Sequence, residues 1–525
     1  MRVSVILQAL VGVGLFAAAA SAQPAPSARP IPTPKPSLGT NLSGPADWNT
    51  ELPFVDVFRL SRTWISQKQG EGWGKGPPLE LDALGWVKKL EPNCYAESPL
   101  MTIEGGRFPK GQYTVFYKGK GKVTFNAAKT VSSEPGKMII EPDRPHGIFL
   151  QIRETDPADP IRDIRVVMPG HETTYETQPF RPGFLDLWRG VTCIRFMDWQ
   201  HTNNSTLAKW ADRPTLEDAT WTVKGVPVEV MIDLANELDA DPWFCMPHLA
   251  DDDFVRQFAT LVKQKLEPER KVYVEYSNEV WNGQFQQSRW AGEQGIQLKF
   301  AEKPWEAAWK FTGYRSKQVF KIWEEVFGGT DRLVRCLPTQ AANAYVSERV
   351  VEFQDAYQSA DALAIAPYMT CNVPEKGDKL TAAEVEKWTV DQAMDFMEQT
   401  SLPETEKWLA EQKKTADKFG LKLVCYEAGQ HMVGVVGGEN NEAMMKLFHE
   451  ANRSERMGKL YEKYYAAWEA AGGDLLCNFS SISNWSKWGS WGLMEYYDSK
   501  PSEYPKFVST MNWAKKLGQK ITPLE

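Results

Sequence analysis

The segment Lys271-Val-Tyr-Val-Glu-Tyr-Ser-Asn-Glu279 decides the fold, because a short apolar strand in it runs directly into a polar, acidic end. A second run of this kind, Leu421 to Tyr426, ends at Glu427. A carboxylate is costly in an apolar core, but it is useful at the mouth of a barrel, where the carboxyl ends of parallel strands gather catalytic groups. The two glutamates therefore predict a barrel whose mouth carries an active site.

Strands and helices alternate around that segment, a pattern that is typical of a parallel α/β fold. Helical patterns occupy residues 227–238, 253–266, 285–327, 382–419 and 441–471. The apolar runs between them predict eight strands, at residues 38–42, 191–196, 242–246, 271–276, 333–337, 362–366, 421–426 and 474–479. Eight strands connected in this way indicate a (β/α)8 TIM barrel.

The first connection of the predicted barrel contains an insertion. Its short apolar strands are separated by glycines and show almost no helical pattern, which predicts an antiparallel β-sandwich. The predicted order is a signal peptide at 1–22, a proline-rich linker at 23–37, the first part of the barrel at 38–76, the sandwich at 77–178 and the main part of the barrel at 179–525.

The amino terminus predicts export of the chain. Arg2 precedes an apolar stretch, and small residues at positions 20–22 form a cleavage site for a secretory signal peptide. A retained membrane anchor is the alternative, although the stretch is short for one. We expect a secreted or periplasmic protein that has no membrane partner after cleavage.

The composition narrows the classes of partner. A net charge of −8 argues against nucleic acid and anionic membranes. Most of the seven cysteines fall in apolar runs and are predicted to be small buried hydrophobes. The six histidines make a histidine-rich metal site improbable, and no nucleotide-binding or metal-binding motif is present, so we expect no metal and no cofactor. The oligomeric state stays open.

The motifs at the ends of strands four and seven resemble those of the clan of retaining (β/α)8-barrel glycoside hydrolases. Asn278-Glu279 resembles the clan's acid/base signature, and Glu427 resembles its nucleophile. Arg195, His248 and Tyr368 occupy places where several families of the clan carry supporting residues, as does Trp485 after strand eight. The resemblance covers the barrel and not the sandwich, and it does not extend to a single family.

The resemblance implies a division of labour between the two carboxylates. Glu427 would be the ionised nucleophile, with Arg195 and Tyr368 beside it, and Glu279 would be an acid/base with a raised pKa. Asn278 would hold the hydroxyl next to the anomeric carbon. The plainer alternative is that each glutamate is a salt-bridge partner or a helix cap, and that Arg195 is a buried partner of a strand-end carboxylate. Glu275 is the rival to Glu279 and is expected to be a core ion-pair member.

Aromatic and polar residues after the predicted strands are candidates for substrate binding, because indole faces suit the apolar faces of sugar rings. Loop packing is the alternative for the tryptophans, and His431 lines the cleft or merely fills a loop. Asp251 to Asp253, after His248, are expected to cap a helix rather than bind a metal. The substrate-binding candidates are Asp198, Trp199, Trp281, Asn282, His431, Trp485 and Trp488.

These expectations together describe a secreted retaining hydrolase that cleaves β-glycosidic bonds in a polysaccharide or oligosaccharide. The carbohydrate is its only expected partner. A non-catalytic carbohydrate-binding protein on a degenerate barrel is the alternative from another class. An envelope scaffold tethered by the proline-rich segment is a third, and it predicts no affinity for glycans.

Overall fold

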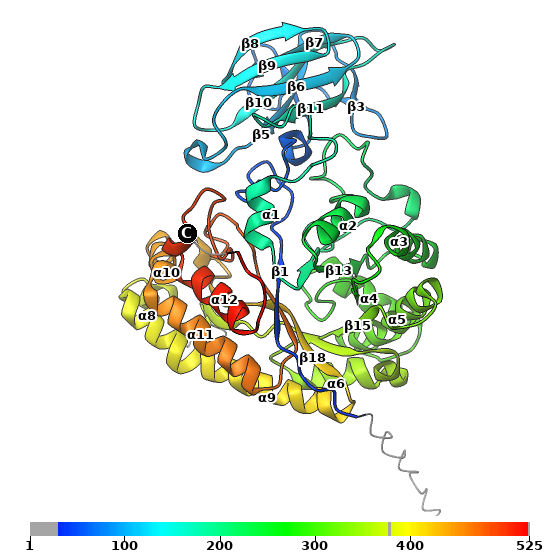
Figure 1. The fold of residues 1–525 in the computed structure, drawn as a ribbon, viewed down its shortest axis with the longest axis vertical. Helices are drawn as coiled ribbons and strands as arrows, with labels where there is room; N and C mark the ends of the chain where they lie inside the picture. The colour runs from blue at the N-terminus through cyan, green and yellow to red at the C-terminus, as the bar shows by residue number, and fades with distance from the viewer. Residues whose placement is uncertain (1–29, 376–379, 523–525) are drawn as a thin grey trace, which may run out of the picture.

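A computed structural model describes residues 30–375 and 380–522 of the 525-residue chain. A barrel surrounded by helices forms one part, and a β-sandwich beside the barrel forms the other (Figure 1). The predicted signal peptide at 1–22 lies outside the described residues. Across the two described ranges, no helix has both the length and the apolar character that a membrane span requires.

Eight parallel strands close into a barrel, which confirms the predicted fold class. Each strand pairs with its neighbours in chain order, and the first strand pairs with the last to close the ring. The strands are β1 (Ser37–Asn41), β12 (Cys193–Arg195), β13 (Asp241–Met246), β14 (Val272–Tyr276), β15 (Leu333–Pro338), β16 (Ala362–Ile365), β18 (Lys422–Ala428) and β20 (Leu475–Asn478).

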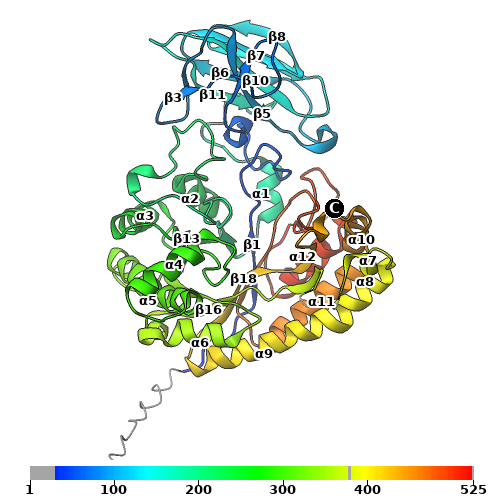
Figure 2. The same cartoon turned by 180° about the vertical axis from the view of Figure 1, so that it is seen from behind.

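Helices form a ring around the barrel (Figure 2). They are α1 (Pro182–Trp188), α2 (Val228–Glu237), α3 (Asp252–Lys265), α4 (Gln286–Gln297), α5 (Pro304–Phe327), α6 (Ala344–Glu352), α7 (Ala382–Val385), α8 (Val390–Phe396), α9 (Leu402–Lys418), α10 (Glu442–Arg453), α11 (Glu455–Ala470) and α12 (Pro505–Lys516).

Helix α3 shows how the sequence defines these helices. The Asp251 side chain accepts a hydrogen bond from the backbone N–H of Phe254 at 2.8 Å, so the acidic residues cap the helix as predicted. Phe254 and Phe258 lie on its apolar face and are buried against the barrel. Burying one such side chain contributes about 1.5–3 kcal/mol. The helix is therefore held by its packed face and by its cap.

Small side chains are required where β1 meets its two neighbouring strands. Gly39 on β1 is paired with Cys193 on β12 and Cys477 on β20. A Cβ atom on Gly39 would lie 2.7 Å from the Cys477 sulfur and 2.9 Å from the Cys193 carbonyl, so only glycine fits. Six of the seven cysteines are buried, as predicted for small hydrophobes.

The sandwich consists of two four-stranded antiparallel sheets, in the orders β2-β5-β10-β7 and β11-β6-β9-β8. Their strands are β2 (Ile65–Lys68), β5 (Cys94–Leu100), β6 (Tyr113–Lys118), β7 (Gly121–Asn126), β8 (Ala128–Glu134), β9 (Lys137–Pro142), β10 (Ile148–Thr155) and β11 (Arg162–Val167). The sheets thus begin at Ile65, before the predicted start at residue 77, because β2 pairs with β5. A short hairpin of β3 (Glu80–Leu81) and β4 (Val87–Lys89) lies between those two strands in sequence.

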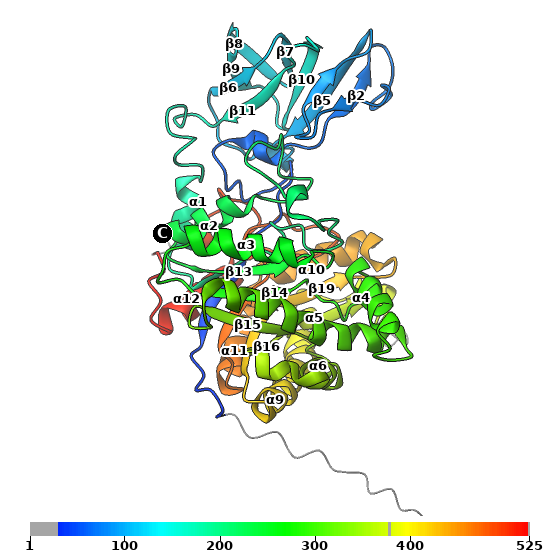
Figure 3. The same cartoon turned by 90° about the vertical axis from the view of Figure 1, so that its right-hand side faces the viewer.

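The chain enters and leaves the sandwich through a paired junction. Phe54 forms a bridge with Phe180, and the backbone N–H of Val55 donates to the carbonyl of Pro179 at 2.9 Å. The side view shows the sandwich beyond α1 and α2, outside the ring of helices (Figure 3). The entry and exit segments therefore lie side by side, between the sandwich and the barrel.

Candidate active site

The two predicted glutamates both lie at the carboxyl ends of barrel strands. Glu279 follows β14, and the residues on this turn have unusual backbone angles, with φ of +58° at Ser277 and +42° at Glu279. Positive φ in a residue other than glycine costs roughly 1–3 kcal/mol and persists where surrounding structure enforces it, often at functional sites. Glu427 lies on β18, where the register with β20 shifts between Cys425 and Ala428. Such irregularities re-aim side chains next to active sites.

Arg195, at the end of β12, connects the two strand ends. Its guanidinium donates to Glu427 Oε1 at 2.8 Å and to Asn278 Oδ1 at 2.8 Å. It also forms a fully buried ion pair with Glu275, at 3.0 Å. Glu275 is thus the core ion-pair member that the sequence predicted. Removing Arg195 would leave two carboxylates without their counter-ion in a buried site.

Glu427 is held by donors at both carboxylate oxygens. Besides Arg195 at Oε1, the Tyr368 hydroxyl donates to Oε2 at 3.0 Å. Burial and the Glu427 charge raise the pKa of Tyr368 well above its usual value, so the phenol keeps its proton and remains a donor. An arginine and a tyrosine thus hold the two oxygens of one carboxylate.

Glu279 has the opposite environment. Asn282 Nδ2 donates to its Oε2 at 3.0 Å, and the Tyr426 hydroxyl lies 3.5 Å from its Oε1. The Trp281 indole N–H donates to that same hydroxyl at 3.2 Å, so Trp281 and Asn282 both belong to the surroundings of Glu279. Burial raises the pKa of Glu279 to about 8, and the charge of Glu427 adds to this shift. Glu279 is therefore protonated at neutral pH.

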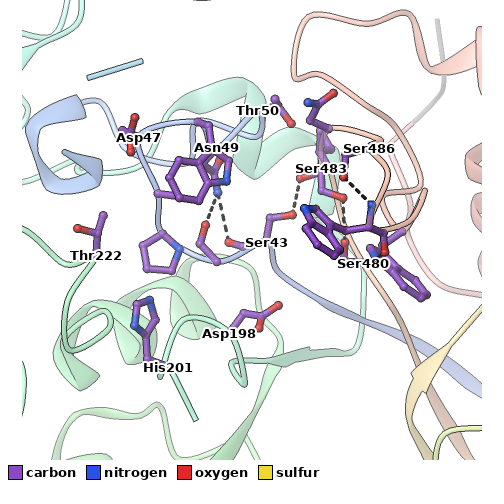
Figure 4. A pocket seen from close by; sticks show the side chains of 18 of the residues that line it. Ser43, Asp47, Asn49, Thr50, Asp198, His201, Thr222, Ser480, Ser483 and Ser486 are labelled. Atoms are coloured by element: carbon purple, nitrogen blue, oxygen red, sulfur yellow. Dashed lines mark hydrogen bonds between the residues drawn. The ribbon is translucent and has the colours of Figure 1, made fainter. Parts of the chain in front are cut away.

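A cavity of about 700 Å³ lies at the mouth of the barrel, and neither Glu279 nor Glu427 lines it. Figure 4 shows residues from the loops after β1, β12 and β20 around it, including Ser43, Asp198 and Ser480. Tyr368, which binds Glu427, packs with its ring edge-on against two aromatic residues of the cavity wall, Phe479 and Trp491, with ring centroids 6.4 and 5.9 Å away. Two residues of the cavity wall thus contact the tyrosine that donates to Glu427.

Asp198 connects the cavity and the carboxylate pair electrostatically. Burial raises the pKa of Asp198 to about 7, and the Glu427 charge pushes it in the same direction against the opposing effect of Arg195. Its carboxyl group lines the cavity, and no described residue donates a hydrogen bond to it. Asp198, a predicted substrate-binding residue, thus lines the cavity.

No known protein family matches the sequence, and no functionally curated protein matches it. Among solved structures, a Bacteroidetes-affiliated GH5 cellulase has a TM-score of 0.39 at 10% identity, covering 65% of this chain and 85% of its own. The CBM22-GH10 modules of a Clostridium thermocellum xylanase have a TM-score of 0.38 at 9% sequence identity. That match covers 91% of this chain and 100% of the xylanase chain. A rhamnosyl-glucuronidase from Fusarium oxysporum 12S has a TM-score of 0.37 at 12% sequence identity, and the match spans 61% of each chain. At this level of similarity, the case for function rests on the geometry of the site.

The two predicted histidines differ in position. His431 lies on β19 (Gln430–Gly434), which pairs with β17 (Met369–Val373) above the barrel. Its ring contacts Trp491 and Tyr368, so it belongs to the wall of the site. His248 instead packs against Trp290, and no hydrogen bond or ring contact joins it to either glutamate among the described residues. Burial lowers the pKa of each histidine to about 4, which keeps both rings neutral.

Two of the predicted sugar-binding tryptophans are core residues. Trp199 is only 1% exposed, and its indole N–H donates to the Ser43 carbonyl at 3.0 Å. Trp485 is 4% exposed and is enclosed by the cations of Arg453 and Lys506. Both expectations were wrong, because these rings turn beneath their loops and leave no face for a ligand. Trp488 from the same loop as Trp485 does line the cavity.

Several polar residues of the site were not predicted from the sequence. Asn41 Oδ1 accepts a hydrogen bond from Arg195 at 3.1 Å, and Asn203 Oδ1 accepts from Asn278 at 3.0 Å and from Gln287 at 2.7 Å. Asn41 carried a usable signal, since it is a polar residue at the end of the predicted first strand. Asn203 and Gln287 lie in a loop and a helix, where polar residues are common and give no such signal.

Proposed function

We propose that the protein is a retaining glycoside hydrolase that cleaves β-linked oligosaccharides or polysaccharides. The observation that carries this proposal is the contrast between two neighbouring carboxyl groups. Glu427 is ion-paired with Arg195 and hydrogen-bonded by Tyr368, whereas Glu279 has its pKa raised to about 8. A pair of carboxyl groups with opposite protonation states is what double displacement at a glycosidic bond requires.

In the first step, an oxygen of Glu427 attacks the anomeric carbon while Glu279 transfers its proton to the departing oxygen. The glycosidic bond breaks, and an ester bond forms between the sugar and Glu427. In the second step, Glu279 takes a proton from water, and the resulting hydroxide oxygen displaces Glu427 from the anomeric carbon. The sugar leaves with its original configuration, and both carboxyl groups return to their starting state.

The electrostatics of the pair support this change of role. Part of the upward pKa shift of Glu279 comes from the negative charge of Glu427. Once Glu427 is esterified, that charge is gone, so the pKa of Glu279 falls and its carboxylate form becomes more stable. Glu279 is thus an acid when Glu427 is free and a base when Glu427 is esterified.

Asn278 is placed to contact the sugar beside the reacting carbon. Its Oδ1 accepts from Arg195, and one N–H of its amide donates to Asn203. An amide NH₂ group carries two hydrogens, so a second donor remains for a substrate hydroxyl. The fixed amide orientation supports a contact with the hydroxyl next to the anomeric carbon.

The proposed activity is tested with aryl β-glycosides and with soluble and insoluble β-glycans. We expect release of reducing sugar, and proton NMR during the first minutes should show the product anomer with retained configuration. Initial release of the inverted anomer would contradict the double-displacement mechanism. Binding of glycans without any release would favour the non-catalytic carbohydrate-binding alternative.

The pKa of Glu279 predicts the alkaline limit of activity. Glu279 must be protonated in the first step, and its pKa of about 8 keeps it protonated below that pH. We therefore expect kcat/KM to be retained below pH 8 and to fall above it, since kcat/KM reports groups of the free enzyme. Asp198→Asn should keep this limit, whereas Glu279→Ala, assayed with an activated aryl glycoside, should lose it. An unchanged alkaline limit in Glu279→Ala would refute the assignment.

A further inference from the structure

Two exposed indoles, Trp48 and Trp488, belong to the lining of the cavity at the mouth of the barrel. Trp48 follows β1 and is 57% exposed, and Trp488 follows β20 and is 63% exposed. Figure 4 shows Asp47 and Asn49, the two neighbours of Trp48, on the loop after β1. Indole faces suit the apolar faces of sugar rings, and cavities of about 300–1,000 Å³ hold ligands larger than one ring.

Each indole is fixed by a cation. The Arg62 guanidinium lies 5.6 Å from the centre of the Trp48 ring, and the Lys487 ammonium lies 4.7 Å from that of Trp488. A cation over a ring restrains it through the cation–π attraction. Because more than half of each side chain stays accessible, each indole still has surface on which another flat, partly apolar group can stack.

The segment that carries Trp48 is clamped to the sandwich. The Asp47 carboxylate accepts two hydrogen bonds from Arg62, at 2.9 and 2.7 Å, and one from the Thr102 hydroxyl at 2.5 Å. The backbone N–H of Thr102 also donates to the Asp47 carbonyl at 2.7 Å. Arg62 and Thr63 themselves line the cavity at the start of the sandwich. The inserted domain thus builds one wall of the cavity.

The residues that line the cavity offer no unpaired cation to an anionic ligand, and Lys487, which lies over Trp488, is outside the lining. Among the described residues that line the cavity, Arg62 is the one lysine or arginine, and its charge is neutralised by Asp47. Burial lowers the pKa of His201, which keeps that ring neutral. No described residue donates a hydrogen bond to the Asp198 carboxyl group, so it is free to bind hydroxyls of a neutral ligand.

We propose that this cavity is a subsite for neutral sugar units next to the bond that is cleaved, with Trp48 and Trp488 stacking on their rings. The proposal rests on the hydrolase function proposed above, and it assigns the substrate class to neutral β-linked oligosaccharides of several units. Asp47 is a positioning residue, which acts by holding Trp48. The inserted sandwich then contributes directly to substrate selection.

The first test compares substrates of different length. Trp48→Ala and Trp488→Ala should each lower kcat/KM about tenfold on β-1,4-linked oligosaccharides of glucose, xylose or mannose with four to six units, since an aromatic stacking contact contributes on this scale. The same variants should leave kcat/KM on aryl monosaccharides within about twofold. Asp47→Asn should reproduce the Trp48→Ala pattern. Equal losses on short and long substrates, or no loss on either, would overturn the proposal.

Trp73→Ala is the matched control, because Trp73 is also an exposed indole, at 55%, but lies on the sandwich outside the cavity lining. It should behave as the wild type. An anionic ligand, an oligomer of β-1,4-linked mannuronate, should bind at least tenfold more weakly than neutral oligomers of the same length. Tighter binding of the anionic oligomer would contradict the assigned substrate class.

Binding measured by calorimetry separates this proposal from the catalytic one. In a Glu427→Gln background, adding Trp48→Ala should weaken the Kd for the neutral hexasaccharides about tenfold. If the wild type hydrolyses none of the substrates but Trp48→Ala still weakens binding, the subsite is supported and the hydrolase function is refuted. Should hydrolysis occur while Trp48→Ala leaves the Kd unchanged, the subsite fails alone. Absence of binding by every neutral oligosaccharide also refutes the subsite.

Discussion

Replacing Glu427 with glutamine is expected to lower kcat by at least about 10⁴-fold, because loss of a covalent nucleophile removes the reaction path itself. Glutamine has nearly the same shape, and its amide oxygen can still accept a hydrogen bond from Arg195, which now donates to Glu427 Oε1 at 2.8 Å. The fold should therefore remain. The measurement is single-turnover and steady-state hydrolysis of an aryl β-glycoside, with circular dichroism to verify folding.

A surface carboxylate provides the control for the Glu427 variant. Glu293 lies exposed on α4, so Glu293→Gln should keep wild-type kcat and unfolding temperature. Full activity of a folded Glu427→Gln protein would end the assignment of Glu427 as the nucleophile. If Glu427→Gln is both inactive and unfolded, Glu427→Asp is the second variant to test. It keeps the carboxylate but moves it away from the anomeric carbon, so the protein should be folded and its activity strongly reduced.

Replacing Glu279 with alanine is expected to give a loss that depends on the leaving group. General acid catalysis contributes about 10²–10⁴-fold, so natural glycans with poor leaving groups should lose that factor. A dinitrophenyl glycoside departs without protonation, and its first step should be much less affected. Since the base is missing in the second step, the glycosyl-enzyme should accumulate, and a burst of dinitrophenol should be seen by stopped flow.

Azide supplies an independent readout for the Glu279 variant. Without the carboxylate, a small anion can enter and attack the anomeric carbon of the glycosyl-enzyme, so azide should raise turnover and yield a glycosyl azide of retained configuration. Glu275→Gln is the comparison, because Glu275 is a buried partner of Arg195 rather than a participant in the reaction. It should lower stability and show no azide rescue. Rescue of Glu275→Gln and not of Glu279→Ala would reverse the two roles.

The barrel and its two glutamates could be predicted because their signals are local. Each strand is a short apolar run, and the polar residues that interrupt it, such as those around Glu279 and Glu427, mark the mouth of the barrel. The positions of Arg195 and Tyr368 beside Glu427 were implied by the resemblance to the hydrolase clan, which carries such residues at the ends of strands two and six. Parallel strands bring these ends to one edge, which is consistent with that implied proximity.

The remainder of the site depends on the conformations of loops, which neither the hydrophobic periodicity nor the composition of the sequence predicts. Trp485 and Trp488 are three residues apart in one glycine-rich loop, yet the first is buried over Lys506 and the second is exposed. The early start of the sandwich was missed because β2 is short and partly polar, and its pairing with β5 supplies the stability that its own sequence lacks. Trp48 had no strand pattern around it to single it out.

Because the sandwich is inserted between β1 and β12, the order of folding affects how readily the barrel closes. Asn41 and Arg195, which pair across these strands, are 154 residues apart in sequence. Once the sandwich has formed, its paired junction at Phe54 and Phe180 shortens the segment to be closed to about 30 residues, which lowers the entropic cost of closure by about 1.5 kcal/mol. During synthesis the sandwich emerges before seven of the eight barrel strands. Its folding therefore brings the chain after β1 close to the chain that leads into β12 before the later strands are made.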